Sequence, residues 1–135
     1  MLKGLATVVV LLMIIATDTV QVQGFPSGKK TVRVQNDLDG GTLLYLHCRS
    51  KDNDLGLHVL ATQTYQEWSF HDNVSGTTLF WCKFQFDGVA EVSFEIYSAK
   101  TDDSQCGSQC WRSIRKDGAY FYDEYKKIWV RRYSW

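Results

Sequence analysis

The sequence predicts an all-β domain, a small antiparallel β-sandwich of about seven to nine strands that two disulfides hold together. Three observations predict it. Apolar and polar residues alternate along most of the chain instead of recurring with helical spacing. Asp-Gly and Asn-Asp pairs, which favour turns, separate the alternating runs. The chain also has four cysteines, an even number. Since a strand with one apolar face must bury that face, two sheets packed together are expected.

The clearest strands are predicted by alternating runs at residues 31–35, 44–49, 80–86 and 92–97. Asp87-Gly88 lies between the last two runs, and this dipeptide is typical of a two-residue β-hairpin turn. Shorter strands are expected at residues 58–60, 67–70, 110–115, 119–122 and 128–132. Asp117-Gly118 would turn the chain between two of them, and residues 122–127 are expected to form a loop or a bent strand.

The N-terminus predicts export from the cell. Lys3 is followed by an apolar run at residues 5–16. This run is too short to cross a bilayer, which needs about 20 residues, and its position after a basic residue is typical of a secretory signal peptide. A membrane anchor or a core helix is the alternative, which Asp18 and the polar residues behind it disfavour. Residues 1–24 are therefore expected to be removed, leaving residues 25–135 as one extracellular domain.

The four cysteines predict two disulfides, because an even set in an exported chain is oxidised in pairs. They are Cys48, Cys82, Cys106 and Cys110. Three pairings are possible, and the sequence leaves them open. We expect each late cysteine to join an early one, because a Cys106–Cys110 bond would close a very small loop. A zinc site is the alternative, but only one of the cysteine pairs has the short spacing that zinc knuckles need.

Charge is balanced overall but uneven along the chain. The sequence has 15 basic and 15 acidic residues. Residues 25–108 hold seven basic and 11 acidic residues, whereas residues 109–135 hold seven basic and three acidic ones. This layout would steer association with a partner or between two copies, so a homodimer is among the expected assemblies. An ordinary solvated surface explains the same pattern, and a neutral exported chain is not expected to bind nucleic acid.

No catalytic, metal-binding or cofactor-binding site is expected. The sequence lacks the nucleophile-elbow, phosphate-loop, dinucleotide and H-E-x-x-H motifs. Its histidines show no metal-ligand spacing; they are His47, His58 and His71. Two pairs of carboxylates resemble what a glycosidase needs, namely Asp52/Asp54 and Asp102/Asp103. Both pairs lie in turn-like, charged surroundings, so we expect ionised loop acids rather than an acid and base.

Two further segments carry functional hypotheses. Asn73-Val74-Ser75 is an acceptor sequence for N-glycosylation, and Gly76 behind it predicts an exposed turn. Residues 125–135 mix cations with aromatic residues. This segment would suit a defence protein that binds a membrane surface or a cell-wall glycan. The other interpretation is a last strand that covers the core.

The order and spacing of several blocks resemble the plant self-incompatibility S-protein homologue family. The blocks are V-Q-N-D-L at residues 34–38, L-H-C-R-S-K-D-N-D-L-G-L-H-V-L at 46–60, G-T-T-L-F-W-C-K-F at 76–84 and R-K-D-G-A-Y at 115–120. The resemblance implies a secreted β-sandwich with two disulfides and no catalytic site. Members that give the family its name are stigma proteins that bind a receptor on the pollen membrane. The expected function is therefore an extracellular signal, in pollen rejection or a related exchange between cells, with a cell-surface receptor as partner.

Partner contacts are expected on loops, because loops carry function on rigid β scaffolds. The candidate loops lie at residues 37–42, 71–76 and 99–109. The candidate partner-binding residues are Asp39, His71, Asp102 and Asp103. By contrast, the Asp52-Asn53-Asp54 turn, followed by Gly56 with access to positive φ, is expected to be a structural corner.

Overall fold

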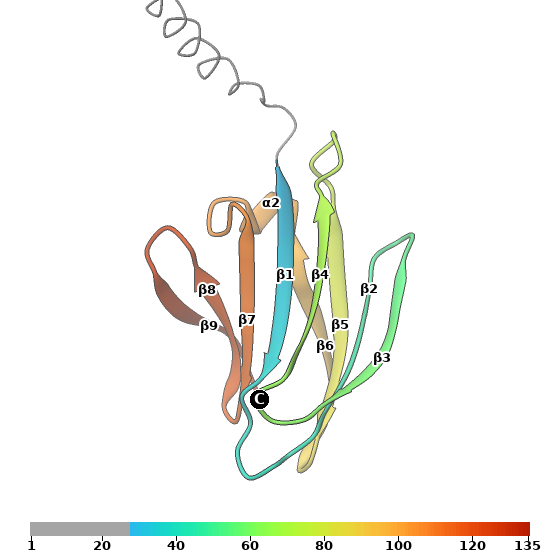
Figure 1. The fold of residues 1–135 in the computed structure, drawn as a ribbon, viewed down its shortest axis with the longest axis vertical. Coiled ribbons are helices and arrows are strands. Elements are labelled where there is room, and N and C mark those ends of the chain that lie inside the picture. The colour runs from blue at the N-terminus through green and yellow to red at the C-terminus, as the bar shows by residue number, and fades with distance from the viewer. Residues whose placement is uncertain (1–27) are drawn as a thin grey trace, which may run out of the picture.

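The strands of the described chain follow the order that alternation predicts. The computed structural model describes residues 28–135, and the predicted secretory leader, residues 1–24, lies outside them. The strands are β1 (Lys29–Asn36), β2 (Leu44–Arg49), β3 (Asp54–Leu60), β4 (Tyr65–His71), β5 (Leu79–Phe86), β6 (Val89–Ser98), β7 (Gln109–Arg115), β8 (Gly118–Asp123) and β9 (Ile128–Ser134), and a short helix, α2 (Ala99–Asp102), follows β6 (Figure 1).

Two sheets form the sandwich, which confirms the predicted fold class. The five-stranded sheet has the order β4-β1-β7-β8-β9, and the four-stranded sheet has the order β3-β2-β5-β6. One neighbouring pair is parallel: β1 runs alongside β7, with Thr31 opposite Gln109. The other pairs are antiparallel. The parallel pair is a departure from the expected antiparallel arrangement. It arises because β1 and β7 enter the sheet from the same end of the molecule (Figure 1).

The core lies between the sheets because alternate residues of each strand point inward. In β1, Val32 and Val34 are fully buried, while Arg33 between them is partly exposed. Burial of a side chain of this size contributes about 1.5–3 kcal/mol. Lys30 and Asn36 stand in the same inward phase and are also buried, at 1% and 0% exposure. The strand therefore carries polar groups into both ends of the core.

Turns occur where the Asp-Gly pairs predict them. Asp87-Gly88 joins β5 to β6, with Gly88 at φ 78°. The chain also turns between β7 and β8, just before Gly118, where a Cβ atom would lie 2.2 Å from the backbone oxygen of Tyr133. The predicted last strand is confirmed as β9. The predicted strand at residues 58–60 is too short, because the β2–β3 ladder already starts with Arg49 opposite Asp54.

The disulfides pair differently from our expectation. Cys48 bonds Cys82, and Cys106 bonds Cys110. The expected pairing of late with early cysteines is wrong for a topological reason. Cys48 and Cys82 stand directly opposite each other on the neighbouring strands β2 and β5. Cys110 belongs to β7, in the other sheet, and the chain before it folds back so that Cys106 lies beside it, with 5.2 Å between the two Cα atoms.

Candidate functional site

One end of the sandwich gathers most of the predicted partner-binding loops. The helix α2, the β2–β3 turn and the β4–β5 loop all lie at this end, which we call the α2 end (Figure 1). His71, Asp102 and Asp103 belong to it. Asp39 lies in the β1–β2 connection at the opposite end (Figure 1). The structure therefore brings together three of the predicted residues and separates the fourth from them.

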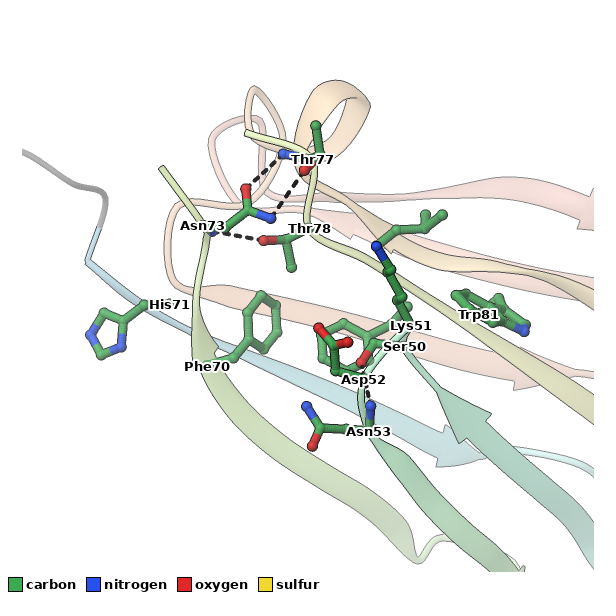
Figure 2. Close-up of a pocket in the computed structure, with 12 residues that line it drawn as sticks. Ser50, Lys51, Asp52, Asn53, Phe70, His71, Asn73, Thr77, Thr78 and Trp81 are labelled. Atoms are coloured by element: carbon green, nitrogen blue, oxygen red, sulfur yellow. Dashed lines mark hydrogen bonds between the residues drawn. The ribbon is translucent and has the colours of Figure 1, made fainter. Parts of the chain in front are cut away.

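A groove of about 560 Å³ lies at the α2 end, between the β2–β3 turn and the β4–β5 loop. Its lining comes from residues 50–53, 70–71, 73 and 77–81 (Figure 2). Its base is aromatic, since Phe70 packs against Phe80 and Tyr97 with ring centroids 4.8 and 5.0 Å away. Lys51 and Asp52 are exposed on the turn at one side. Such a combination of aromatic base and polar rim is typical of binding clefts.

His71 stands at the edge of this groove but points away from it (Figure 2). The alternation of β4 explains this orientation, because Phe70 points inward and the next residue must point outward. On the outer face of the sheet, His71 is opposite Lys29 in the ladder. Sequence reasoning selected the right loop, but the groove is built by residues that it did not select, among them Phe70 and Trp81. The alternation of inward and outward side chains along Trp68-Ser69-Phe70 is the signal that would have identified Phe70 as inward-facing.

The predicted glycosylation residue organises the β4–β5 loop. The Asn73 side-chain oxygen accepts hydrogen bonds from the backbone N–H of Thr77 at 2.8 Å and the hydroxyl of Ser75 at 3.1 Å. Its amide nitrogen donates to the Thr77 hydroxyl at 3.0 Å, and its backbone N–H donates to the Thr78 hydroxyl at 2.8 Å (Figure 2). The residue is exposed. These bonds fix the loop that forms one wall of the groove, and glycosylation of Asn73 stays a prediction.

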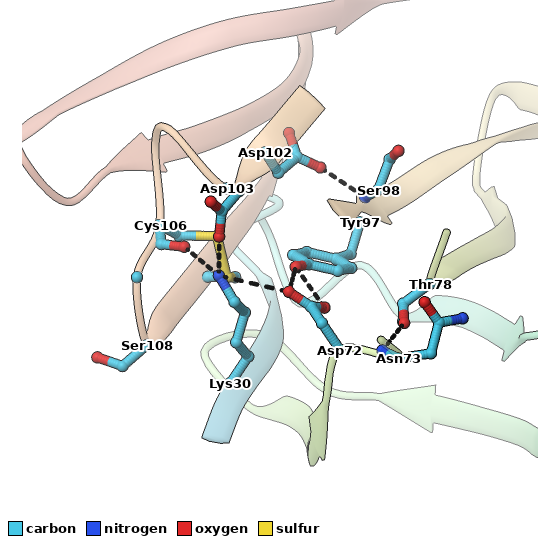
Figure 3. A network of polar contacts seen from close by, with 12 residues as sticks. Lys30, Asp72, Asn73, Thr78, Tyr97, Ser98, Asp102, Asp103, Cys106 and Ser108 are labelled. Carbon is cyan, nitrogen blue, oxygen red and sulfur yellow. Dashed lines mark hydrogen bonds and ion pairs between the residues drawn. A yellow bond between two sulfur atoms is a disulfide. The ribbon is translucent and has the colours of Figure 1, made fainter. Parts of the chain in front are cut away.

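A buried lysine ties three segments together behind this loop (Figure 3). The Lys30 ammonium, 1% exposed, donates to the Asp103 carboxylate at 2.7 Å and to the backbone oxygen of Cys106 at 3.0 Å. It lies 3.8 Å from a carboxylate oxygen of Asp72. Tyr97 donates its hydroxyl to the same Asp72, at 2.7 and 2.9 Å to the two oxygens. Burial, and then the bond to Asp72, raise the pKa of Tyr97, so it remains a hydrogen-bond donor.

Asp102 is not the exposed loop acid that the sequence predicted. Its side chain is 2% exposed and accepts the backbone N–H of Ser98 at 2.8 Å. It pairs with Arg132 at 3.1 Å and lies 3.7 Å from Arg112. The helix α2 causes the difference, since its single turn directs Asp102 into the protein while Asp103 stays outside, 65% exposed. Burial lowers the pKa of Arg112 to about 10, an effect that Asp102 opposes.

The carboxylate of Glu124 binds the short loop that the Cys106–Cys110 disulfide closes. Glu124 accepts hydrogen bonds from the backbone N–H groups of Gly107, Ser108 and Gln109, at 2.9, 3.1 and 3.1 Å. Partial burial raises the pKa of Glu124, but these backbone donors outweigh that effect, and the pKa is lower than usual. The carboxylate therefore holds the segment between Cys106 and Cys110 against the β8–β9 turn.

In the Asp52/Asp54 pair, Asp54 is bonded within its own turn. The Asp54 carboxylate accepts the backbone N–H of Gly56 at 2.9 Å and contacts the His47 ring nitrogen at 2.5 Å. The bond from Gly56, followed by the bond from His47, lowers the pKa of Asp54, as expected of an ionised turn acid. Among residues 28–135, no group of three or more His, Cys, Asp or Glu side chains is placed to hold a metal ion. No helix in the same residues is long and apolar enough to cross a membrane.

Comparison with known proteins identifies relatives of this chain. Residues 31–135 match the family model described as plant self-incompatibility protein S1. S-protein homolog 6 of Arabidopsis thaliana is 35% identical over 94% of the chain and 94% of its own length, and S-protein homolog 24 of the same plant is 34% identical over 94% and 85%. Self-incompatibility protein S1 of Papaver rhoeas is 38% identical over 73% of the chain and 71% of its own length.

A solved structure has the same fold. It is the structure of an SPH (self-incompatibility protein homologue) protein. The SPH proteins are described as a widespread family of small, highly stable, secreted proteins from plants. It superposes with a TM-score of 0.53 and 22% identity, covering 81% of the chain and 91% of the solved chain. At this identity the likeness is one of fold.

Proposed function

Because this chain belongs to the plant self-incompatibility protein S1 family, we propose that it is a secreted ligand that binds a cell-surface receptor and acts without catalysis. The name of the Papaver rhoeas relative supports a role in self-incompatibility or a related signal between cells. The predicted leader and the two disulfides support export, since disulfides persist in oxidising compartments.

The groove at the α2 end is the observation that carries the proposal. Its two walls are turns held by internal hydrogen bonds, and its base is a packed aromatic cluster. A surface that is already ordered loses little conformational entropy when a partner binds, which leaves more of the contact energy for affinity. Aromatic residues are also enriched in the cores of protein–protein interfaces, and polar residues surround those cores. The receptor contact is therefore assigned to the groove and to the exposed Asp103 beside it.

The remaining predicted contacts follow from their positions. His71 faces the outer side of the five-stranded sheet, so it would contribute to a partner that extends over that edge. Asp39 lies at the opposite end and would belong to a separate contact. A homodimer also stays a prediction, since its support is the uneven charge along the chain.

Cell binding tests the proposal. Labelled, oxidised protein starting at residue 25 is applied to intact cells from several plant tissues, and saturable binding is expected on at least one of them. Reduced and alkylated protein is the matched control, since it has the same sequence without the fold. Equal binding of the two forms, or binding that never saturates, would contradict a receptor ligand.

Glycosylation at Asn73 would affect this contact directly. A glycan at this position would stand at the rim of the groove, because Asn73 is one of its lining residues. Mass spectrometry of the protein secreted by plant cells would establish whether the residue is modified. If it is, binding by the enzymatically deglycosylated protein should differ from binding by the secreted form. If the two forms bind equally, the receptor does not reach this wall of the groove.

A further inference from the structure

The outer face of the five-stranded sheet carries aromatic and arginine side chains that contact one another. We call it the aromatic–arginine face. Its members are Tyr65 on β4, Arg33 on β1, Trp111 and Arg115 on β7, Tyr120 and Tyr122 on β8, and Trp129 on β9. They share this face because their neighbours along each strand, such as Val32 and Phe121, point into the core.

Strand pairing sets the aromatic residues side by side. Trp111 stands opposite Arg33 in the parallel ladder, and Tyr122 stands opposite Trp129. The ring centroids of Trp111 and Tyr122 are 5.9 Å apart, and those of Tyr122 and Trp129 are 5.0 Å apart. Trp129 remains 39% exposed and Tyr65 46% exposed. The rings between them are partly exposed, and a contiguous group of large aromatic rings open to solvent is uncommon on a monomer unless it binds something.

Two arginines lie over these rings. The Arg33 guanidinium carbon is 4.1 Å from the Tyr65 ring centroid and 5.1 Å from that of Trp111. The Arg115 guanidinium carbon is 4.0 Å from the Tyr120 ring centroid and 5.3 Å from that of Trp129. Stacking of this kind orients a guanidinium in advance of binding.

Both arginines keep their outer nitrogen atoms free for a ligand. Arg33 donates its Nε–H to Glu67 at 2.8 Å, and Arg115 donates its Nε–H to Ser113 at 2.9 Å. Within residues 28–135, neither side chain makes a further hydrogen bond through its terminal nitrogens, and no carboxylate pairs with Arg115. Each arginine therefore presents the planar pair of N–H groups that matches a carboxylate.

A cavity of about 220 Å³ lies on the aromatic–arginine face. It is lined by Trp111, Trp129, Arg33, Gln35, Asp37 and Arg112. The Gln35 side chain uses its amide nitrogen to donate to Asp37 at 2.8 Å, which leaves its carbonyl oxygen available as an acceptor. The cavity thus combines two apolar ring faces and a guanidinium with an amide oxygen and the Asp37 carboxylate, two acceptors for sugar hydroxyls, at a size that suits one sugar ring.

We propose that the aromatic–arginine face binds an acidic oligosaccharide, one whose sugar rings carry carboxylates. A pyranose ring has an apolar C–H face, which would stack on Trp111 and Trp129. The hydroxyls at the edge of the ring would donate hydrogen bonds to the side-chain oxygen of Gln35. Carboxylates on successive sugars would receive paired hydrogen bonds from Arg33 and Arg115. The site is distinct from the groove at the α2 end, and it places the predicted glycan contact on a sheet face rather than on a C-terminal tail, since residues 128–134 are a strand of that sheet.

Charge on this face favours a saccharide over nucleic acid or membrane. Arg33 is paired with Glu67, and Arg131 is paired with Asp117 at 3.1 Å. These carboxylates offset much of the positive charge. A polyphosphate backbone and an anionic bilayer both need a continuous excess of cations. A sugar chain with spaced carboxylates needs separate guanidinium groups beside ring platforms, which is the arrangement present.

Titration of the ¹⁵N-labelled oxidised protein with a linear hexamer of galacturonic acid tests the proposal. The indole N–H signals of Trp111 and Trp129 should shift on binding, while that of Trp81, at the α2 end, should stay in place. Trp129→Ala and Arg115→Gln should each weaken binding about tenfold. Two variants on the outer face of the other sheet are matched controls, Tyr45→Ala with a ring 43% exposed and Arg49→Gln, and both should bind as the unchanged protein does.

Other results would overturn the proposal. Absence of binding, or a native-like Trp129→Ala protein that binds with unchanged affinity, would remove the site. Equal binding of a neutral glucose hexamer would remove the role of the arginines, and so would unchanged affinity of Arg115→Lys, which keeps the charge but loses the planar fork. Tighter binding of a single-stranded oligonucleotide or of phosphatidylserine vesicles would assign the face to a different ligand. Trp81→Ala separates this site from the receptor groove, since it should leave saccharide binding intact.

Discussion

The two ends of the sandwich are held by different chemistry. At the α2 end, ionised side chains that come from distant parts of the sequence hold the loops, among them Lys30, Asp102 and Glu124. At the opposite end a neutral amide does the equivalent work. Asn36 is fully buried and makes three hydrogen bonds of 2.8–2.9 Å to backbone groups of neighbouring loops. Both ends are ordered, but the α2 end relies on buried charged groups and the Asn36 end on a buried neutral one.

This difference explains how exposed loops can form a fixed groove. The Lys30–Asp103 contact joins residues 73 positions apart, and Glu124 reaches back to Gly107, 17 positions away. Such contacts fix the separate segments relative to one another, which local turn hydrogen bonds do not. The α2 end should therefore respond to loss of charge, to reduction and to acid more than the Asn36 end does.

Removal of the buried ammonium should have the largest effect. Lys30→Met leaves Asp103 and the Cys106 carbonyl without a donor and Asp72 without its cation. Loss of one partner of a buried ion pair costs about 3–5 kcal/mol. Lys29→Met is the matched control, because Lys29 is the exposed neighbour on the same strand, and its cost should stay within about 0.5 kcal/mol. Urea unfolding of both variants gives the comparison. Equal stabilities would contradict the role of charge at this end.

The two disulfides should differ in their contributions. Cys48–Cys82 spans 34 positions of the sequence and Cys106–Cys110 spans four. Loop-closure entropy predicts a loss of about 4 kcal/mol for Cys48→Ser/Cys82→Ser and about 2 kcal/mol for Cys106→Ser/Cys110→Ser. Thermal unfolding of the two double variants measures the order. A larger loss from the small loop would mean that it stabilises the α2 end mainly through native contacts.

Two glycines at opposite ends sharpen the contrast further. In Gly118→Ala the new Cβ would meet the backbone oxygen of Tyr133 at 2.2 Å, so the β8–β9 ladder must move, at a cost of about 1–3 kcal/mol. In Gly107→Ala the Cβ would meet the hydroxyl of Tyr125 at 2.5 Å, and this exposed side chain can rotate away. The second variant should lose less than about 1 kcal/mol. Chemical denaturation of both distinguishes the cases, and a reversed order would contradict the packing described.

Acid should selectively weaken the Glu124 contact. Because the folded pKa of Glu124 is lowered, its stabilisation is complete above the usual carboxyl pKa and is lost as the pH falls through the folded value. Glu124→Gln should therefore be less stable than the unchanged protein by roughly 1 kcal/mol at pH 7, since the carboxylate is largely exposed to screening. The difference should shrink as the pH falls through the folded pKa of Glu124, so it should be smaller at pH 3 than at pH 7. Denaturation curves at the two pH values test this, and a difference that persists undiminished in acid would implicate packing instead.

Alternation predicts most of the strands because it reports a local property, the in-out phase of each residue. The same phase predicts an inward Lys30, in line with Val32 and Val34, although the expected strand began one residue later. Pairing between distant strands is not a local property. The parallel β1–β7 pair could not be predicted from either strand alone.

The misassigned disulfides and Asp102 have related causes. The cysteine pairing depends on which strands share a sheet, and sequence spacing carries no such information. Asp102 lies in a helix of four residues, too short to show helical periodicity, so its inward direction left no pattern. The candidate groove could not be predicted from the sequence either, because the β2–β3 turn and the β4–β5 loop meet only in the folded chain.

Competition on cells tests most directly the claim that the α2 end is the receptor surface. Labelled protein is bound to responsive cells and displaced by unlabelled variants with a reversed charge. Lys116→Glu changes the β7–β8 turn at the opposite end and should compete as well as the unchanged protein. Lys51→Glu changes the rim of the groove and should compete at least about tenfold more weakly. Equal competition by the two variants, both correctly folded, would contradict the assignment.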